Sequence, residues 1–296
     1  MMRQRMRMLI VLLLLTFLTS CVASDLNEAK QQYEMALQAE YPLPHYKAAL
    51  EELDTALNRD ATNAQAYAIK GLIYRNLEDY EQATKNLEIA KQGSYGTQQQ
   101  WVPLLVNLTY GDIFHAQASN AIRSGDWERA KSYQETSLEF FSNVINSASG
   151  NLGLITDGDA LGVTMQDMYV SAQGRWAAAK YQMAAIAGRT ESKERQSELL
   201  RESTTRLNGV VEAYPDVAVL RYYLAEGYRK QALTLRRTDP EESGRLQALA
   251  VSQLRACAEL GLPRDLRNPA AQLFNVLSKG GESDTEQKIL GMPASQ

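Results

Sequence analysis

Large and small apolar residues recur at a fixed spacing of 34 positions near the start of the chain. The two sets match position by position: Tyr33, Tyr46, Ala49, Leu53 and Ala56 recur as Tyr67, Tyr80, Ala83, Leu87 and Ala90. Within each set the apolar residues follow the period of a helix, and no stretch of useful length alternates as a strand would. The pattern predicts an all-α chain built from a repeated pair of helices.

The second set has further small and aromatic residues, Gly71 and Tyr74, between the recurring ones. As a whole it resembles the tetratricopeptide repeat: Tyr67-x3-Gly71-x2-Tyr74-x5-Tyr80-x2-Ala83-x3-Leu87-x2-Ala90. In that family, small residues let two antiparallel helices approach and aromatic residues fill the gap to the next pair. The resemblance implies a right-handed α-solenoid in which the first helix of each pair lines a concave groove.

Looser copies follow along the chain. Gly125-Asp126-Trp127 matches Glu78-Asp79-Tyr80 as an acidic and aromatic turn into a second helix, and Ala130 aligns with Ala83. The predicted later helices span residues 98–123, 126–145, 163–187, 191–213, 217–236 and 241–260, with a glycine-containing loop at 146–162. Asn268-Pro269 predicts the start of a capping helix that ends near Ser278.

The first helix is predicted to start at an N-cap formed by Ser24 or Asp25. We therefore expect five helical pairs plus a C-terminal capping helix, in one domain over residues 24–279. Residues 280–296 are polar and are predicted to be a frayed tail.

The first twenty residues differ from the rest of the chain. Arg3, Arg5 and Arg7 form a basic segment, and residues 8–18 are apolar apart from Thr16. An apolar run of about 11 residues is too short for a membrane-spanning helix, which needs roughly 20. Residues 1–20 therefore predict an export signal that is cleaved from the mature chain.

The signal ends in Leu18-Thr19-Ser20-Cys21, which resembles the lipobox of bacterial lipoproteins. The resemblance implies lipid attachment to Cys21, cleavage before it, and acylation of the new amino terminus. Residues 21–23 would then be the lipidated anchor and a linker that reaches only about 10 Å. Val22 stands where an aspartate favours inner-membrane retention in enterobacterial families, so the expected location is the periplasmic face of the outer membrane.

The charge of the mature chain gives no electrostatic case for binding nucleic acid. The whole sequence carries a formal charge of −4, and removing residues 1–20 takes away three arginines and no acidic residue, which leaves −7. Once Cys21 is lipidated only Cys257 is left, so no disulfide within the chain is expected.

The sequence holds little that points to catalysis, a cofactor or a metal. The two histidines, His45 and His115, lie in no metal-ligand spacing. The loop Thr156-Asp157-Gly158-Asp159 lacks the remaining ligands of a calcium site and is interpreted as a polar turn. We expect no enzyme activity, no cofactor and no metal.

The tetratricopeptide resemblance implies that ligands bind along the first helix of each pair. Counting from the recurring aromatic position selects polar and aromatic residues that would face a protein or peptide partner. These predicted groove residues are Gln65, Leu72, Arg75, Asn76, His115, Arg123, Tyr222, Glu226 and Arg229.

Two functions are compatible with the sequence. The first is a membrane-anchored scaffold or assembly factor that binds an envelope protein. The second is a small-molecule-binding accessory lipoprotein of a transporter, in which a cavity lined by Trp101, Tyr169 or Trp176 would hold the ligand. An enclosed cavity with that lining favours the second function, and a shallow groove favours the first.

Overall fold

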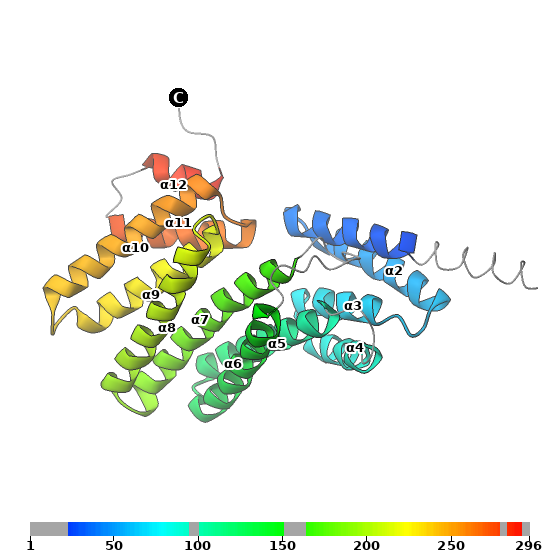
Figure 1. Cartoon of the computed structure of the whole chain (residues 1–296), viewed down its shortest axis with the longest axis horizontal. Helices are drawn as coiled ribbons and strands as arrows, with labels where there is room; N and C mark the ends of the chain where they lie inside the picture. Colours follow the sequence, from blue (N-terminus) through cyan, green and yellow to red (C-terminus); the bar gives the residue numbers. More distant parts are fainter. Residues whose placement is uncertain (1–22, 95–100, 151–163, 279–282, 292–296) are drawn as a thin grey trace, which may run out of the picture. The chain divides into compact units, whose positions relative to one another are not determined.

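The fold is seen in a computed structural model, which describes residues 23–94, 101–150, 164–278 and 283–291 (Figure 1). Every regular element in these ranges is an α-helix, so the predicted all-α class is confirmed. The described residues form two compact units that divide after Thr109, with Met165 in the first unit and Gln166 in the second. The assignment of residues 24–279 to one domain stays a prediction. The export signal and Cys21 lie outside the described residues.

The first unit contains two helical pairs of the tetratricopeptide type. Its helices are residues 23–38, α2 (Leu43–Arg59), α3 (Ala64–Asn76), α4 (Tyr80–Gly93) and the beginning of α5 (Trp101–Ser124). The 34-residue recurrence marks buried positions, since Ala49 and Leu53 of α2 and their counterparts Ala83 and Leu87 of α4 are all inaccessible to solvent. Gly71 lets α3 and α4 approach, because a Cβ there would lie 2.6 Å from Leu87 Cδ2.

The chain is already helical at residue 23, where the described residues begin. Ser24 and Asp25 therefore lie within the helix, and neither is its N-cap. The Asp25 carboxylate is mostly buried and accepts a 2.5 Å hydrogen bond from Arg59 at the end of α2. A partner for this buried charge explains why the aspartate is tolerated at the contact between the two helices.

The second unit continues α5 from Tyr110 and adds pairs α5–α6, α7–α8 and α9–α10, followed by two shorter helices. The bounds are α6 Trp127–Ser149, α7 Met165–Thr190, α8 Lys193–Ala213, α9 Ala218–Leu235, α10 Pro240–Leu260, α11 Arg264–Ser278 and α12 Ser283–Leu290. Leu200, Leu207, Leu220 and Leu224 lie in one hydrophobic cluster of α7, α8 and α9. With the first unit, the described helices follow the predicted order of five pairs and a cap. None of them is long and apolar enough to span a membrane.

The turns between paired helices repeat one local geometry. Glu78 and Gly125 both have positive φ, 61° and 79° respectively. The next residue in each case, Asp79 or Asp126, caps the following helix by accepting a hydrogen bond from a backbone N–H at 3.1 Å. The predicted match between these two turns is confirmed, although only one of them has the glycine that positive φ favours.

Replacing Glu78 with glycine should raise the free energy of unfolding by about 1 kcal/mol, because an L-residue in left-handed backbone is strained. The matched change Gly125→Ala introduces that strain and should lower it by a similar amount, since a Cβ at Gly125 meets no atom within 4 Å and only the backbone responds. Urea denaturation of the two variants measures both effects. Two shifts of the same sign would contradict this account of the turn.

Three predictions about helix ends and the tail were wrong, because tertiary packing extends two helices and adds a third. The loop predicted from residue 146 starts later, since α6 runs to Ser149 and fully buries Ala148; residues 151–162 of that loop lie outside the described residues. The capping helix α11 begins at Arg264 with Pro269 inside it, which brings Leu266 onto the hydrophobic cluster of α9–α12. The tail predicted to fray forms α12, whose Ile289 is buried in the same cluster.

Candidate functional site

Polar side chains connect the first helices of successive pairs in the second unit. Asp112 of α5 forms a 2.9 Å ion pair with Arg175 of α7, and both side chains are largely shielded from solvent. Further along the same two helices, Gln182 Nε2 donates a 2.7 Å hydrogen bond to Ser119 Oγ. These polar side chains on the first helices therefore hold α5 against α7.

His115 lies within this row and contacts α6. Gln134 Nε2 is 3.3 Å from His115 Nδ1, which makes Nδ1 the acceptor and leaves the proton on Nε2 in the neutral ring. Burial lowers the pKa of His115, and the nearby Asp112 carboxylate opposes the shift only in part. The folded chain thus favours the neutral imidazole.

This pKa predicts how stability changes with pH. In the unfolded chain His115 titrates near 6.5, whereas in the folded chain it takes up a proton only at lower pH. The stabilisation that His115 provides is present above pH 6.5. It is lost as the pH falls from 6.5 towards the folded-state pKa, because the unfolded chain binds more protons than the folded chain between these two pKa values. His115→Gln should remove this part of the dependence when unfolding free energies are measured between pH 7.5 and 5.5. Identical pH dependence in both proteins would contradict it.

The predicted groove residues of the first unit are only partly accessible. Gln65 and Arg75 are half-buried, and Leu72 is 7% exposed, so the prediction that Leu72 faces a groove is wrong. Asn76 accepts a 2.8 Å hydrogen bond from Arg75 and donates to the hydroxyls of Tyr33 and Tyr46 at 3.3 and 3.2 Å. Asn76 therefore ties α3 to the preceding pair.

The predicted groove residues of the second unit differ in their exposure to solvent. Arg123 at the end of α5 is exposed and donates to Asn120. Tyr222 is 8% exposed and packs on the Tyr223 ring, so the prediction that it faces a groove is also wrong. Glu226 and Arg229 are half-buried and 3.7 Å apart, and Glu226 also lies 3.4 Å from Lys230.

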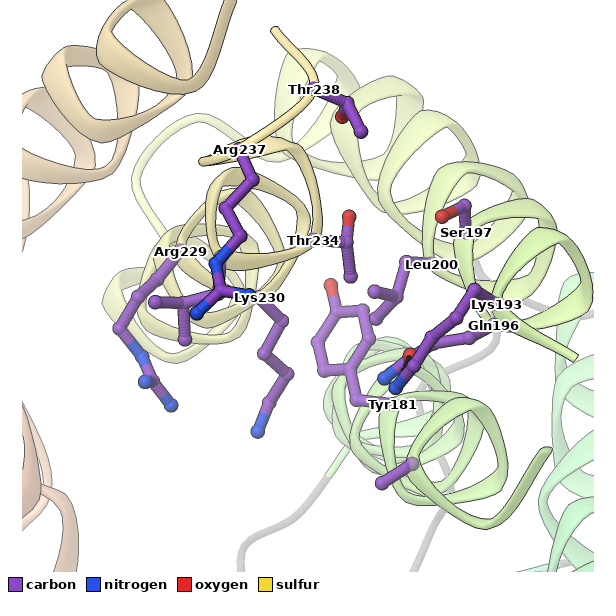
Figure 2. Close-up of a pocket in the computed structure, with 12 residues that line it drawn as sticks. Tyr181, Lys193, Gln196, Ser197, Leu200, Arg229, Lys230, Thr234, Arg237 and Thr238 are labelled. Carbon is purple, nitrogen blue, oxygen red and sulfur yellow. Dashed lines mark hydrogen bonds between the residues drawn. The ribbon is translucent and has the colours of Figure 1, made fainter. Parts of the chain in front are cut away.

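A cleft between α7, α8 and α9 lies beside these last residues (Figure 2). It encloses about 510 Å³, within the range of small-molecule sites. The lining combines basic, hydroxyl and apolar side chains: Tyr181, Ala185, Lys193, Gln196, Ser197, Leu200, Arg229, Lys230, Leu233, Thr234, Arg237 and Thr238. We call this the α7–α9 cleft.

The α7–α9 cleft is cationic. Lys193, Arg229, Lys230 and Arg237 contribute positive charges, and no acidic residue is among the described residues of the lining. The carboxylate of Glu226 lies near two of these cations at 3.4 Å or more, and Lys193 donates to Gln196 at 3.3 Å. The cleft therefore keeps a positive potential that favours an anion.

Tyr181 forms the inner wall of the cleft, and its hydroxyl points towards Leu200 and Thr234 (Figure 2). The hydroxyl oxygen is buried and makes no hydrogen bond of good geometry within the described residues, although Ser203 and Thr204 lie close to it. Burial raises the pKa of Tyr181, so the hydroxyl keeps its proton and can donate it. The absence of a side chain at Gly227 leaves room for the Tyr181 ring, since a Cβ at Gly227 would be 2.7 Å from Tyr181 Cζ.

Of the cleft residues, Arg229 is among the groove residues predicted from the sequence. Tyr181, Lys193 and Arg237 are not, because their helices meet only in the folded chain. The aromatic residues proposed to line a cavity lie elsewhere: Trp176 is covered by Lys180 and Arg206, with the guanidinium carbon 4.1 Å from the ring centroid. The cleft thus differs in its lining from the one predicted for a transporter accessory.

Other reactive groups show no sign of chemistry in the described part of the chain. No cluster of three histidine, cysteine or acidic side chains could hold a metal ion there. The Cys257 thiol is buried and donates to the Ala218 carbonyl at 3.3 Å, and burial raises its pKa to about 12. A thiol that stays protonated is a poor nucleophile.

Comparisons with known proteins add little to this geometry. No protein-family model matches the chain, and no curated protein matches it. Among solved structures, the crystal structure of the P58(IPK) TPR domain is 12% identical, covering 89% of this chain and 96% of that one with a TM-score of 0.21. The tetratricopeptide-like fold therefore rests on the 34-residue recurrence and the helical pairs that it marks.

Proposed function

We propose that this chain is a lipid-anchored helical-repeat protein of the bacterial cell envelope that binds a protein or peptide partner. The observation that carries the binding role is the row of polar and charged side chains on the first helices α5, α7 and α9. Arg123 is exposed on that row, and Glu226 and Arg229 are half-buried beside the cleft. Mixed charges on a rigid helical surface suit recognition by complementary charge.

The proposed anchor explains how the partner would be localised. The lipobox at residues 18–21 implies acylation of Cys21, and the chain is already helical at residue 23. Two or more acyl chains hold a protein stably on a bilayer. The first unit would then stay close to the membrane, on the outer membrane's periplasmic face, and no enzyme activity is proposed.

A pull-down after crosslinking in living cells tests the binding role. Arg123→Glu should reduce recovery of a specific envelope protein about tenfold, since reversing a charge at an interface turns attraction into repulsion. The matched control is Arg195→Glu on the second helix α8, whose arginine is also exposed and pairs with a neighbour on its own helix. Equal recovery with both variants would reject this face as the binding surface.

A further inference from the structure

We propose that the α7–α9 cleft binds a phosphate monoester carried on an apolar body. This site goes beyond the partner-binding role and does not depend on it. The four cations of the cleft come from three places in the chain: Lys193 at the start of α8, Arg229 and Lys230 within α9, and Arg237 beyond its end. Since these residues meet only in the fold, the positive charge is a property of the cleft and not of one helix face.

The Arg229 guanidinium is only partly used by its neighbours in the fold. Arg229 Nη2 lies 3.7 Å from Glu226, and Arg229 Nε makes no hydrogen bond within the described residues. Leaving a buried polar group unsatisfied is costly, so such a group in a native fold calls for an explanation. An anion bound in the cleft would give this guanidinium a closer partner.

The chemistry of the other lining residues favours a phosphate over a carboxylate. Ser197, Thr234 and Thr238 add hydroxyl donors to the four cations. A phosphate monoester has three terminal oxygens and up to two negative charges near neutral pH, so it uses more of these donors than a singly charged carboxylate does.

Apolar side chains complete the lining. Leu200 is buried at the inner end of the cleft. Leu233, which lines the cleft together with the four cations, is 53% exposed. An apolar body next to the phosphate would cover Leu233, and the volume of about 510 Å³ suits a ligand larger than a free anion. The ligand class is therefore an amphiphilic phosphate ester, either a soluble metabolite or a lipid headgroup.

Isothermal titration of the detergent-solubilised full chain tests this proposal with phenyl phosphate and, as the lipid arm, dihexanoyl phosphatidic acid below its micelle concentration. At least one should bind, and more tightly than inorganic phosphate or benzoate. Binding of only one identifies the source of the phosphate. Binding of neither, or tighter binding of benzoate, would overturn the proposal.

Matched variants separate a built site from general charge attraction. Lys230→Gln with Arg237→Gln should weaken binding of the preferred ester about tenfold for each charge-assisted hydrogen bond lost. The control variant Arg201→Gln with Arg236→Gln also removes two positive charges, but from exposed positions outside the cleft. It should change binding less than about twofold. Equal weakening by both double variants would overturn the proposal.

Discussion

Replacing Cys21 with serine is expected to release the protein from the membrane into the soluble periplasmic fraction. The lipobox implies that the Cys21 sulfur carries the lipid, and serine cannot replace it. Transfer should be nearly complete, because a stable anchor requires at least two acyl chains and the variant should carry none.

Fractionation followed by immunoblotting measures this redistribution in cells that express either protein. A second variant, Ser24→Ala, changes a serine just after the lipobox and should stay with the membrane like the wild type. Retention of the Cys21→Ser protein in the membrane fraction would contradict lipid anchoring through this residue.

Phe141→Ala is expected to cause a large loss of stability in the second unit. Phe141 of α6 is 1% exposed, and its ring fills the space left by Gly111, where a Cβ would lie 2.6 Å from Phe141 Cδ1. Removing the ring leaves a cavity that the two helices cannot close fully. The free energy of unfolding should fall by about 3–5 kcal/mol.

Chemical denaturation of Phe141→Ala and of two companions tests this packing. Gly111→Ala should lower stability by about 1–3 kcal/mol, because the added methyl overlaps the ring. Val276→Ala, at a side chain that is 75% exposed, should change stability by less than about 0.5 kcal/mol. A loss for Phe141→Ala no larger than that for Val276→Ala would show that Phe141 does not fill this contact.

The helical pairs could be predicted where a residue type marks a particular structural position, such as a buried helix face or a helix cap. Ala83 and Leu87 are buried because the helical period puts them on the face towards α3, and Asp79 and Asp126 cap helices because a carboxylate accepts from free N–H groups. Pro269 misled the prediction of α11, because burying Leu266 outweighs the hydrogen bond that proline cannot donate. Ser283–Leu290 is polar apart from its end, so only packing on α10 and α11 makes it helical.

The candidate site was less predictable, since register alone cannot separate a groove position from a buried one. Leu72 and Tyr222 were counted onto the groove but are buried, whereas Arg123 is exposed as expected. The α7–α9 cleft depends on Gly227 making room for Tyr181, a residue 46 positions away in the chain. Such a contact leaves no periodic signal in the sequence.

Photo-crosslinking in cells tests whether the first helices of the second unit bind a partner. A photoreactive amino acid replaces Arg123 or Glu226 on the first helices α5 and α9, or Glu139 or Glu198 on the second helices α6 and α8. We expect one envelope protein to be captured from positions 123 and 226 but not from 139 and 198. Capture of the same protein from 139 and 198 alone would contradict this expectation.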